Sequence, residues 1–192
     1  MLNYGKTYRY LHWSMAILFI ISIALIETKG VFNDEALNDG ILTFHIQSGL
    51  ILFALVWFRI GWRLTHSIPP IQPALHTLHK LGVLLVHIAL YAMLIVIPFL
   101  GIVALQTRGI NVNFLGFALP TIISESEGLQ YSLALISYHQ ELGNIMIYSI
   151  LAHLAFSLIH HFIWQDNTLT RMLPMSARFA PSRLLSSRME NS

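Results

Sequence analysis

His139 and His153 lie 14 residues apart in a long apolar segment in the C-terminal half of the chain. On an α-helix, this separation brings two side chains to within about 40° of each other around the axis and about 21 Å apart along it. One face of one helix therefore presents two imidazoles at two depths. His12 and His45, near the starts of two earlier apolar segments, match the depths of His153 and His139, respectively. The spacing predicts two histidine pairs, each joining two helices.

Two neutral imidazoles on opposite faces of a haem iron form a six-coordinate centre that is suited to electron transfer. The chain contains no cysteine, which excludes disulfides, Cys-ligated zinc, iron–sulfur clusters, thiolate-held haem and covalent c-type attachment. A metal must then bind nitrogen, oxygen or methionine sulfur. We therefore predict two b-type haems, one held by His45 and His139 and the other by His12 and His153.

These histidines also have a simpler interpretation. A membrane histidine can serve as a hydrogen-bond partner between helices, and His12, next to Trp13, is typical of the membrane–water interface. Four histidines at two matching depths favour haem over four unrelated contacts. His87 competes with this assignment, because it lies about two turns inside its own apolar segment, near the depth of His12 and His153. The sequence leaves open whether His87 binds haem or lines a quinone site.

His160 continues the same helix face seven residues beyond His153, about 10 Å further along the axis. This position is near the membrane surface, beyond the second haem, where a quinone has room to dock. His160, His87 and Lys80 are candidates for hydrogen-bonding a quinone carbonyl or relaying its protons, as ionisable groups within membranes often do. Contact with lipid headgroups is the alternative for them. We assign headgroup or solvent contact to the three histidines in or beside the connector after the second apolar segment, His66, His76 and His79.

The elements that must position these residues are helices long enough to cross a membrane. Of the 192 residues, 55% are hydrophobic and 10% are charged, and the mean hydropathy is +0.63. Such values are typical of membrane proteins and not of soluble domains. A crossing takes roughly 20 apolar residues, and four segments meet this requirement, at about 10–26, 41–60, 81–105 and 133–164. The predicted fold is all-α, an integral membrane four-helix bundle enclosing two b haems.

The remaining segments are short. We assign residues 1–175 to one transmembrane cytochrome b domain and residues 176–192 to a polar tail. Pro98 is expected to kink the third helix, and the proline-rich residues 65–73 indicate a stiff connector. Glycines within the helices let a flat porphyrin or a neighbouring helix approach the backbone; they are Gly49, Gly82, Gly101 and Gly143. Three polar residues near the pairs are candidates for orienting the imidazoles, namely Ser48, Ser137 and Asn144.

Positive charge is biased to one side of the membrane, which indicates the orientation. If the N-terminus is cytoplasmic, that side carries nine Lys and Arg residues, and the other side carries only Lys29 and Arg108. Six carboxylates also fall on the outer side. We therefore place both termini in the cytoplasm. The pI near 9.0 then reflects a basic membrane face and not a surface for nucleic acid.

Four parts of the sequence resemble the bacterial cytochrome b561 family. They are residues 9–13 (RYLHW), Phe44 with His45, the spacing from His139 to His153, and residues 162–174 (FIWQDNTLTRMLP). The resemblance covers nearly the whole chain, and the last run is its most specific part. It implies a multi-pass protein of the bacterial inner membrane with two b haems. The chain is most similar to the standalone members that oxidise superoxide to oxygen and pass the electrons through both haems to ubiquinone.

The resemblance also implies a catalytic role for two outer cations. Superoxide is an anion, so Lys29 and Arg108 are expected to attract it to the haem held by His45 and His139, the outer haem, and to raise the rate of their encounter. The outer carboxylates oppose this steering, and pairing of Lys29 with Glu27 is the alternative. The expected partners are superoxide, ubiquinone and the lipid bilayer, with no nucleic acid and no protein partner required.

Two other functions remain open from the sequence. One is an electron-transfer anchor subunit of a membrane dehydrogenase or hydrogenase, which the short loops disfavour. The other is a haem-free helical bundle whose histidines are structural.

Overall fold

The computed structural model describes residues 4–66 and 77–173, which form five α-helices, one 3-10 helix and one two-stranded hairpin. The bounds are α1 Lys6–Thr28, α2 Glu35–Thr65, α3 Thr77–Gln106, β1 Asn113–Phe114, β2 Phe117–Ala118, α4 Glu125–Gly128, η1 Leu129–Tyr131 and α5 Ser132–Phe162. Within these residues, α1, α2, α3 and the run from α4 to α5 are long and apolar enough to cross a membrane. The predicted all-α four-helix architecture is confirmed.

Three of the long helices extend beyond the apolar segments predicted from sequence, because hydropathy marks only the part that crosses hydrocarbon. α2 begins at Glu35, where the Asp34 carboxylate accepts a hydrogen bond from the backbone N–H of Leu37 at 3.0 Å and caps the helix. α5 instead ends at Phe162, earlier than expected. Gln165 follows with a φ of 52°, a left-handed conformation that turns the chain away from the helix axis.

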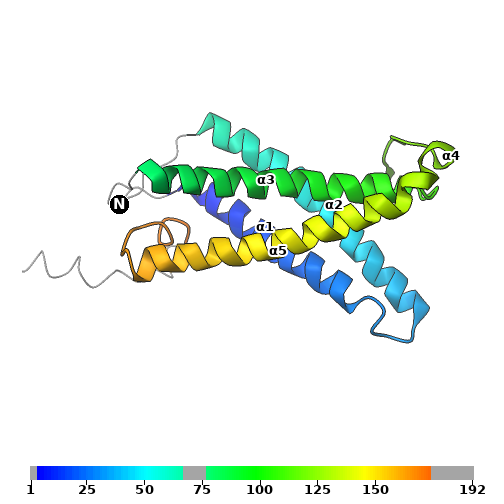
Figure 1. The fold of residues 1–192 in the computed structure, drawn as a ribbon, viewed down its shortest axis with the longest axis horizontal. Helices are drawn as coiled ribbons and strands as arrows, with labels where there is room; N and C mark the ends of the chain where they lie inside the picture. The colour runs from blue at the N-terminus through cyan, green and yellow to red at the C-terminus, as the bar shows by residue number, and fades with distance from the viewer. Residues whose placement is uncertain (1–3, 67–76, 174–192) are drawn as a thin grey trace, which may run out of the picture.

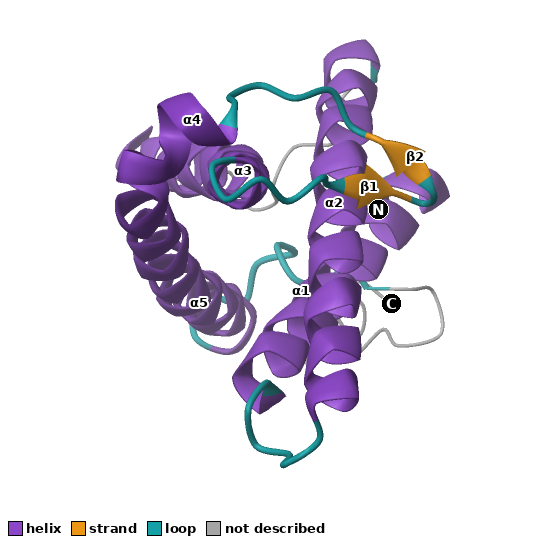
Figure 2. Cartoon of the chain, turned by 90° about the vertical axis from the view of Figure 1, so that its right-hand side faces the viewer, coloured by secondary structure: helices purple, strands orange, loops and turns teal. Residues whose placement is uncertain are grey.

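The helices pack as two pairs. α1 packs mainly against α2, and α3 against α5, while α2 also contacts α3. Figure 1 shows the α1–α2 pair crossing the α3–α5 pair obliquely, and Figure 2 shows the two pairs side by side in a view along the bundle. A buried cluster joins α1 to α2 and packs against α3; its buried members are Leu11, Met15, Leu52 and Val56.

Most large apolar side chains of the helices point outward. Trp57, Phe58, Ile88, Tyr148 and Phe156 are each more than half exposed. A soluble monomer rarely exposes apolar surface on this scale, whereas a bilayer covers it. The outward faces of the bundle are therefore suited to contact with lipid.

The two ends of the bundle differ in structure. Residues 4–8 and 162–173 lie at one end, called the terminal end, and residues 29–34 and 107–131 lie at the other, called the loop end (Figure 1). At the loop end, the β1–β2 hairpin turns through Leu115 and Gly116, both with positive φ. The Gln47 side chain holds this hairpin against α2 by donating to the carbonyl of Asn113 at 2.6 Å and accepting from the N–H of Leu115 at 3.1 Å.

Some sequence predictions concern residues outside the described part of the chain. These are most of the connector at residues 65–73, His76 and the tail at residues 176–192. Pro98 lies within α3, which continues through it as one helix.

Candidate haem and quinone sites

The outer pair, His45 on α2 and His139 on α5, brings two imidazoles together toward the loop end. Their ring centres are 6.2 Å apart and the ring planes are nearly perpendicular, at 88°. Because an imidazole nitrogen binds a metal at about 2 Å, two imidazoles on opposite sides of one metal have centres roughly 6 Å apart. The observed separation therefore matches that of two axial ligands.

Backbone carbonyls fix the protonation of both rings of the outer pair. Nδ1 of His45 lies 2.9 Å from the carbonyl oxygen of Ser22, and Nδ1 of His139 lies 2.8 Å from that of Ile97. A carbonyl only accepts, so each Nδ1 must carry the proton and donate it. Each Nε2 is then left with a free lone pair, which is the form that ligates a metal.

The glycines singled out from sequence have different surroundings. A Cβ on Gly101 would meet the His139 ring at 3.0 Å, so a glycine here lets α3 approach the imidazole. A Cβ on Gly49, Gly82 or Gly143 would meet no atom within 4 Å. Open space beside a helical glycine lets a flat macrocycle or a lipid chain approach the backbone. Gly82 is exposed, whereas Gly49 and Gly143 are half-buried.

The inner cluster consists of His12 on α1, His87 on α3 and His153 on α5. The rings of His87 and His153 are 5.4 Å apart, centre to centre, and perpendicular at 88°. His12 is an electrostatic neighbour of both. Nδ1 of His87 donates to the carbonyl of Val83 at 2.6 Å, which leaves its Nε2 free. The structure thus brings together all three histidines that the sequence placed at this depth.

His12 differs from the other candidate ligands in its hydrogen bond. An Arg59 Nη1 lies 3.0 Å from its Nδ1. Arg59 is buried, with 7% of its surface exposed, and its guanidinium lies 5.1 Å from the centre of the Tyr8 ring and 5.6 Å from that of Tyr91. Arg63 lies 5.9 Å from the same Tyr91 ring. A cationic and aromatic cluster therefore borders the inner histidines.

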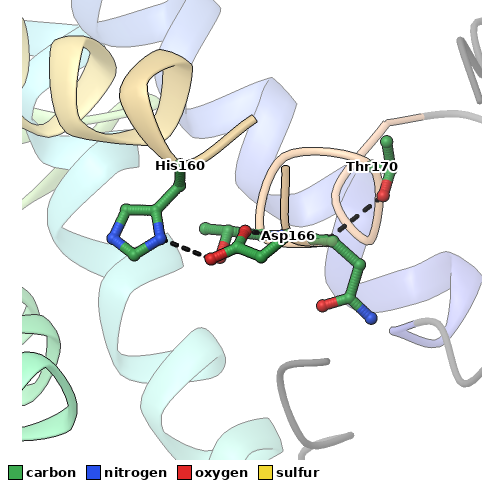
Figure 3. Close-up of polar contacts among 5 residues, drawn as sticks. His160, Asp166 and Thr170 are labelled. Atoms are coloured by element: carbon green, nitrogen blue, oxygen red, sulfur yellow. Dashed lines mark hydrogen bonds and ion pairs between the residues drawn. The ribbon is translucent and has the colours of Figure 1, made fainter. Parts of the chain in front are cut away.

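The quinone-site candidate His160 is buried and paired. Its Nδ1 lies 2.5 Å from Oδ2 of Asp166, and both side chains are less than a tenth exposed (Figure 3). Asp166 Oδ1 accepts a second hydrogen bond from the N–H of Thr168 at 2.8 Å. Trp164 packs edge-on against the His160 ring at 4.4 Å and stacks on His79 at 5.0 Å. Burial and a carboxylate partner distinguish His160 from a residue that contacts headgroups.

The other quinone-site candidates, Lys80 and His87, lie on α3. His79 and Lys80 are exposed residues in the first turn of α3, which the stacking of His79 on Trp164 joins to the end of α5. His87 is seven residues further along α3, about 10 Å deeper. No direct contact joins Lys80, His87 and His160 among the described residues.

The run after α5 folds back onto the start of α1. Arg9 donates from Nη1 to the carbonyl of Leu173 at 2.8 Å, and Trp13 donates from Nε1 to the carbonyl of Met172 at 2.9 Å. The Arg171 guanidinium lies 5.0 Å from the centre of the Tyr4 ring. The two sequence runs that carry the family resemblance at either end of the chain are therefore in contact, and they close the terminal end around His160.

The candidate catalytic cations, Lys29 and Arg108, are both exposed at the loop end. They belong to different loops, residues 29–34 and 107–131, and these two loops lie on opposite sides of this end in Figure 1. The Glu125 carboxylate occupies the space beside Gly109, next to Arg108. The structure gives neither cation a direct contact with His45 or His139.

Three residues with a place in these sites were not found by sequence reasoning. Ser22 accepts the His45 proton at its backbone carbonyl, and its hydroxyl lies 3.2 Å from the same Nδ1. The predicted Ser48 instead donates to the carbonyl of His45. Arg59 was detectable as a charge inside an apolar segment. Asp166 was detectable as the one carboxylate in residues 162–174.

Comparison with known proteins gives a consistent family. A family model described as "Prokaryotic cytochrome b561" matches residues 3–175. "Cytochrome b561 homolog 1" of Escherichia coli K12 is 31% identical over 174 residues, covering 90% of this chain and 97% of the relative. "Probable superoxide oxidase CybB" of Yersinia pestis is 31% identical over 170 residues, covering 85% and 92%, respectively. "Cytochrome b561 homolog 2" of E. coli K12 is 28% identical over 178 residues, covering 91% and 93%.

Proposed function

Because this chain belongs to the prokaryotic cytochrome b561 family, we propose that it oxidises superoxide to oxygen outside the inner membrane and passes the electrons through two b haems to ubiquinone. As a member of this family, the chain is a multi-pass bacterial membrane protein that binds b-type haem and transfers electrons. The observation that carries the proposal is the outer pair, His45 and His139, whose spacing and free Nε2 atoms suit axial ligation. Its likeness to a relative named as a probable superoxide oxidase supports superoxide as the donor.

Two superoxide anions each lose one electron and become oxygen. One quinone takes up both electrons, together with two protons, and becomes quinol. The bound haems supply one-electron transfer between the two sides of the membrane. The protein residues bind, orient and deliver protons. Lys29 and Arg108 raise the local concentration of the anion at the loop end, which faces the periplasm when both termini are cytoplasmic.

For the inner haem, we assign His12 and His153 as ligands. This pair joins the two helix pairs of the bundle, as His45 and His139 do. His87 and His153 instead lie on α3 and α5, which pack directly against each other, and packed helices have axes about 8–10 Å apart. That spacing leaves no room for a porphyrin between two imidazoles. We therefore place His87 beside the inner haem, toward the quinone.

We assign the quinone site to the terminal end, near the inner haem, with His160, His87 and Lys80 as its candidate residues. Asp166 holds the His160 imidazole and can take up or return its proton. A quinone carbonyl needs a hydrogen-bond donor that is recharged from the cytoplasm, and a buried His–Asp pair supplies one.

Purified protein in detergent tests the proposal. We expect two b haems per chain, rapid haem reduction by a superoxide source, and reoxidation on addition of ubiquinone. His45→Ala or His139→Ala is expected to remove one haem and retain the other, whereas His66→Ala, an exposed control, retains both. Two haems that do not respond to superoxide would favour the anchor-subunit function, and protein without haem would contradict the assignment.

A further inference from the structure

The cationic cluster beside His12 lacks a counter-charge. Arg59 is 7% exposed and Arg63 is half-buried, and both lie in the last two turns of α2. Nε of Arg59 is buried and has no hydrogen-bond partner among the described residues. A buried guanidinium whose charge and donors are not satisfied is costly, so a group absent from the chain itself is expected to complete this cluster.

The acidic residues of the chain do not supply that group. Seven of the nine belong to the loop-end half of the molecule: Glu27, Asp34, Glu35, Asp39, Glu125, Glu127 and Glu141. Asp166 is committed to His160, and Glu190 lies outside the described residues. Within residues 4–66 and 77–173, the His160–Asp166 contact is the one ion pair.

The contact between Arg59 and His12 is incompatible with haem ligation. A guanidinium only donates, so Nδ1 of His12 must accept from Arg59 and the ring proton must lie on Nε2. A haem ligand needs the opposite form, with Nε2 free and Nδ1 protonated, as in His45 and His139. When His12 binds iron, its proton moves to Nδ1 and Arg59 loses its acceptor.

We propose that Arg59 and Arg63 bind the propionate carboxylates of the inner haem, and that Arg59 exchanges His12 for a propionate when the haem is loaded. This inference rests on the proposed inner haem at His12. Haem carries two carboxylates at one edge of the ring, and a guanidinium binds a carboxylate through two parallel hydrogen bonds.

The arrangement also affects the reduction potential. An electron added to the haem is stabilised by nearby positive charge, so two guanidiniums at its edge raise the potential of the inner haem. This favours the downhill arrival of electrons from the outer haem. Loss of one guanidinium should lower the potential of that haem alone.

Iron protoporphyrin IX dimethyl ester, in which both carboxylates are neutral, provides the test. Apoprotein carrying Arg59→Gln, Arg63→Gln or Arg59→Lys is reconstituted with haem or with the ester, and binding and midpoint potentials are measured by absorbance. With haem, Arg59→Gln should weaken binding of one haem about tenfold and lower its potential, while Arg59→Lys should retain part of both. With the ester, wild type and Arg59→Gln should behave alike. Lys6→Gln, which removes an exposed cation from the same end, is the control.

The outcomes separate the two proposals. Equal effects of Arg59→Gln on haem and on its ester would overturn the propionate contact, because Arg59 would then act through His12 or the fold. If the Arg59→Gln and Arg63→Gln variants bind two haems as tightly as wild type does, with unchanged midpoint potentials, the propionate contact would be overturned as well. The proposed function would then stay intact. The same measurements are repeated with the protein in nanodiscs of increasing anionic lipid content. If the effects of the arginine substitutions on binding and potential change with that content, equally for haem and its ester, the cluster binds lipid phosphate instead. Failure of wild type to bind an inner haem would instead remove the proposed function on which the inference rests.

Discussion

The imidazoles of His45 and His139 are 6.2 Å apart, centre to centre, although their helices, α2 and α5, belong to different pairs of the bundle. The His45 ring donates to the backbone carbonyl of Ser22 on α1, and the His139 ring donates to that of Ile97 on α3. All four long helices thus contribute to one site. The orientation of both rings is therefore set by the backbone of neighbouring helices.

Gly101→Ala should weaken the outer haem without unfolding the protein. The added methyl group would meet Cε1 of His139 at 3.0 Å and Nδ1 at 3.1 Å, and so turn the ring away from the carbonyl of Ile97. Loss of such an orienting bond costs roughly 10- to 100-fold in metal affinity. Haem titration of the apoprotein measures this. Gly82→Ala, where the methyl group meets open space, is the matched control; equal haem affinity in both variants would contradict the prediction.

Variants of His12 and His87 should separate the two inner-haem assignments. His12→Ala is expected to lose the inner haem, since it removes an axial nitrogen. His87→Ala is expected to keep both haems and to slow reoxidation by ubiquinone. Haem content from the pyridine haemochrome, together with stopped-flow reoxidation, distinguishes these results. Retention of two haems in His12→Ala and loss of one in His87→Ala would reverse the assignment.

Asp166→Asn should uncouple quinone reduction from haem reduction. The amide keeps an oxygen for the N–H of Thr168 but cannot take the proton of His160. We expect quinol formation to fall about a hundredfold, at the lower end of the range for loss of an acid–base group, while superoxide reduces the haems at the wild-type rate. Glu141→Gln, an exposed carboxylate on α5, serves as the control. An equal slowing of both steps would indicate a structural role for Asp166.

Removal of the loop-end cations should slow the encounter with superoxide in a salt-dependent way. The Lys29→Gln, Arg108→Gln double variant is expected to reduce the second-order rate of haem reduction by about tenfold at low ionic strength. At 1 M salt, where screening acts within about 3 Å, variant and wild type should converge. Lys6→Gln, at the opposite end, should have no effect. A rate difference that is independent of salt would show that the two cations do not steer the anion.

Several features were set by the sequence alone. Four apolar segments of sufficient length determine four membrane-crossing helices, and the 14-residue spacing places His139 and His153 on one face of one helix, because the α-helical period is fixed by local backbone geometry. The resemblance of residues 9–13 and 162–174 to the cytochrome b561 family was confirmed by the family match. The assignment of ligands to two haems stays a prediction.

Only the tertiary structure decided which groups from other helices meet those histidines. The His45 proton goes to Ser22 and not to Ser48, Arg59 contacts His12, and Asp166 contacts His160. These contacts depend on how far each helix is rotated, tilted and extended relative to its neighbours, including the end of α5 three residues before Gln165. Rotation and tilt follow from packing across the whole bundle, which no local pattern of residues encodes.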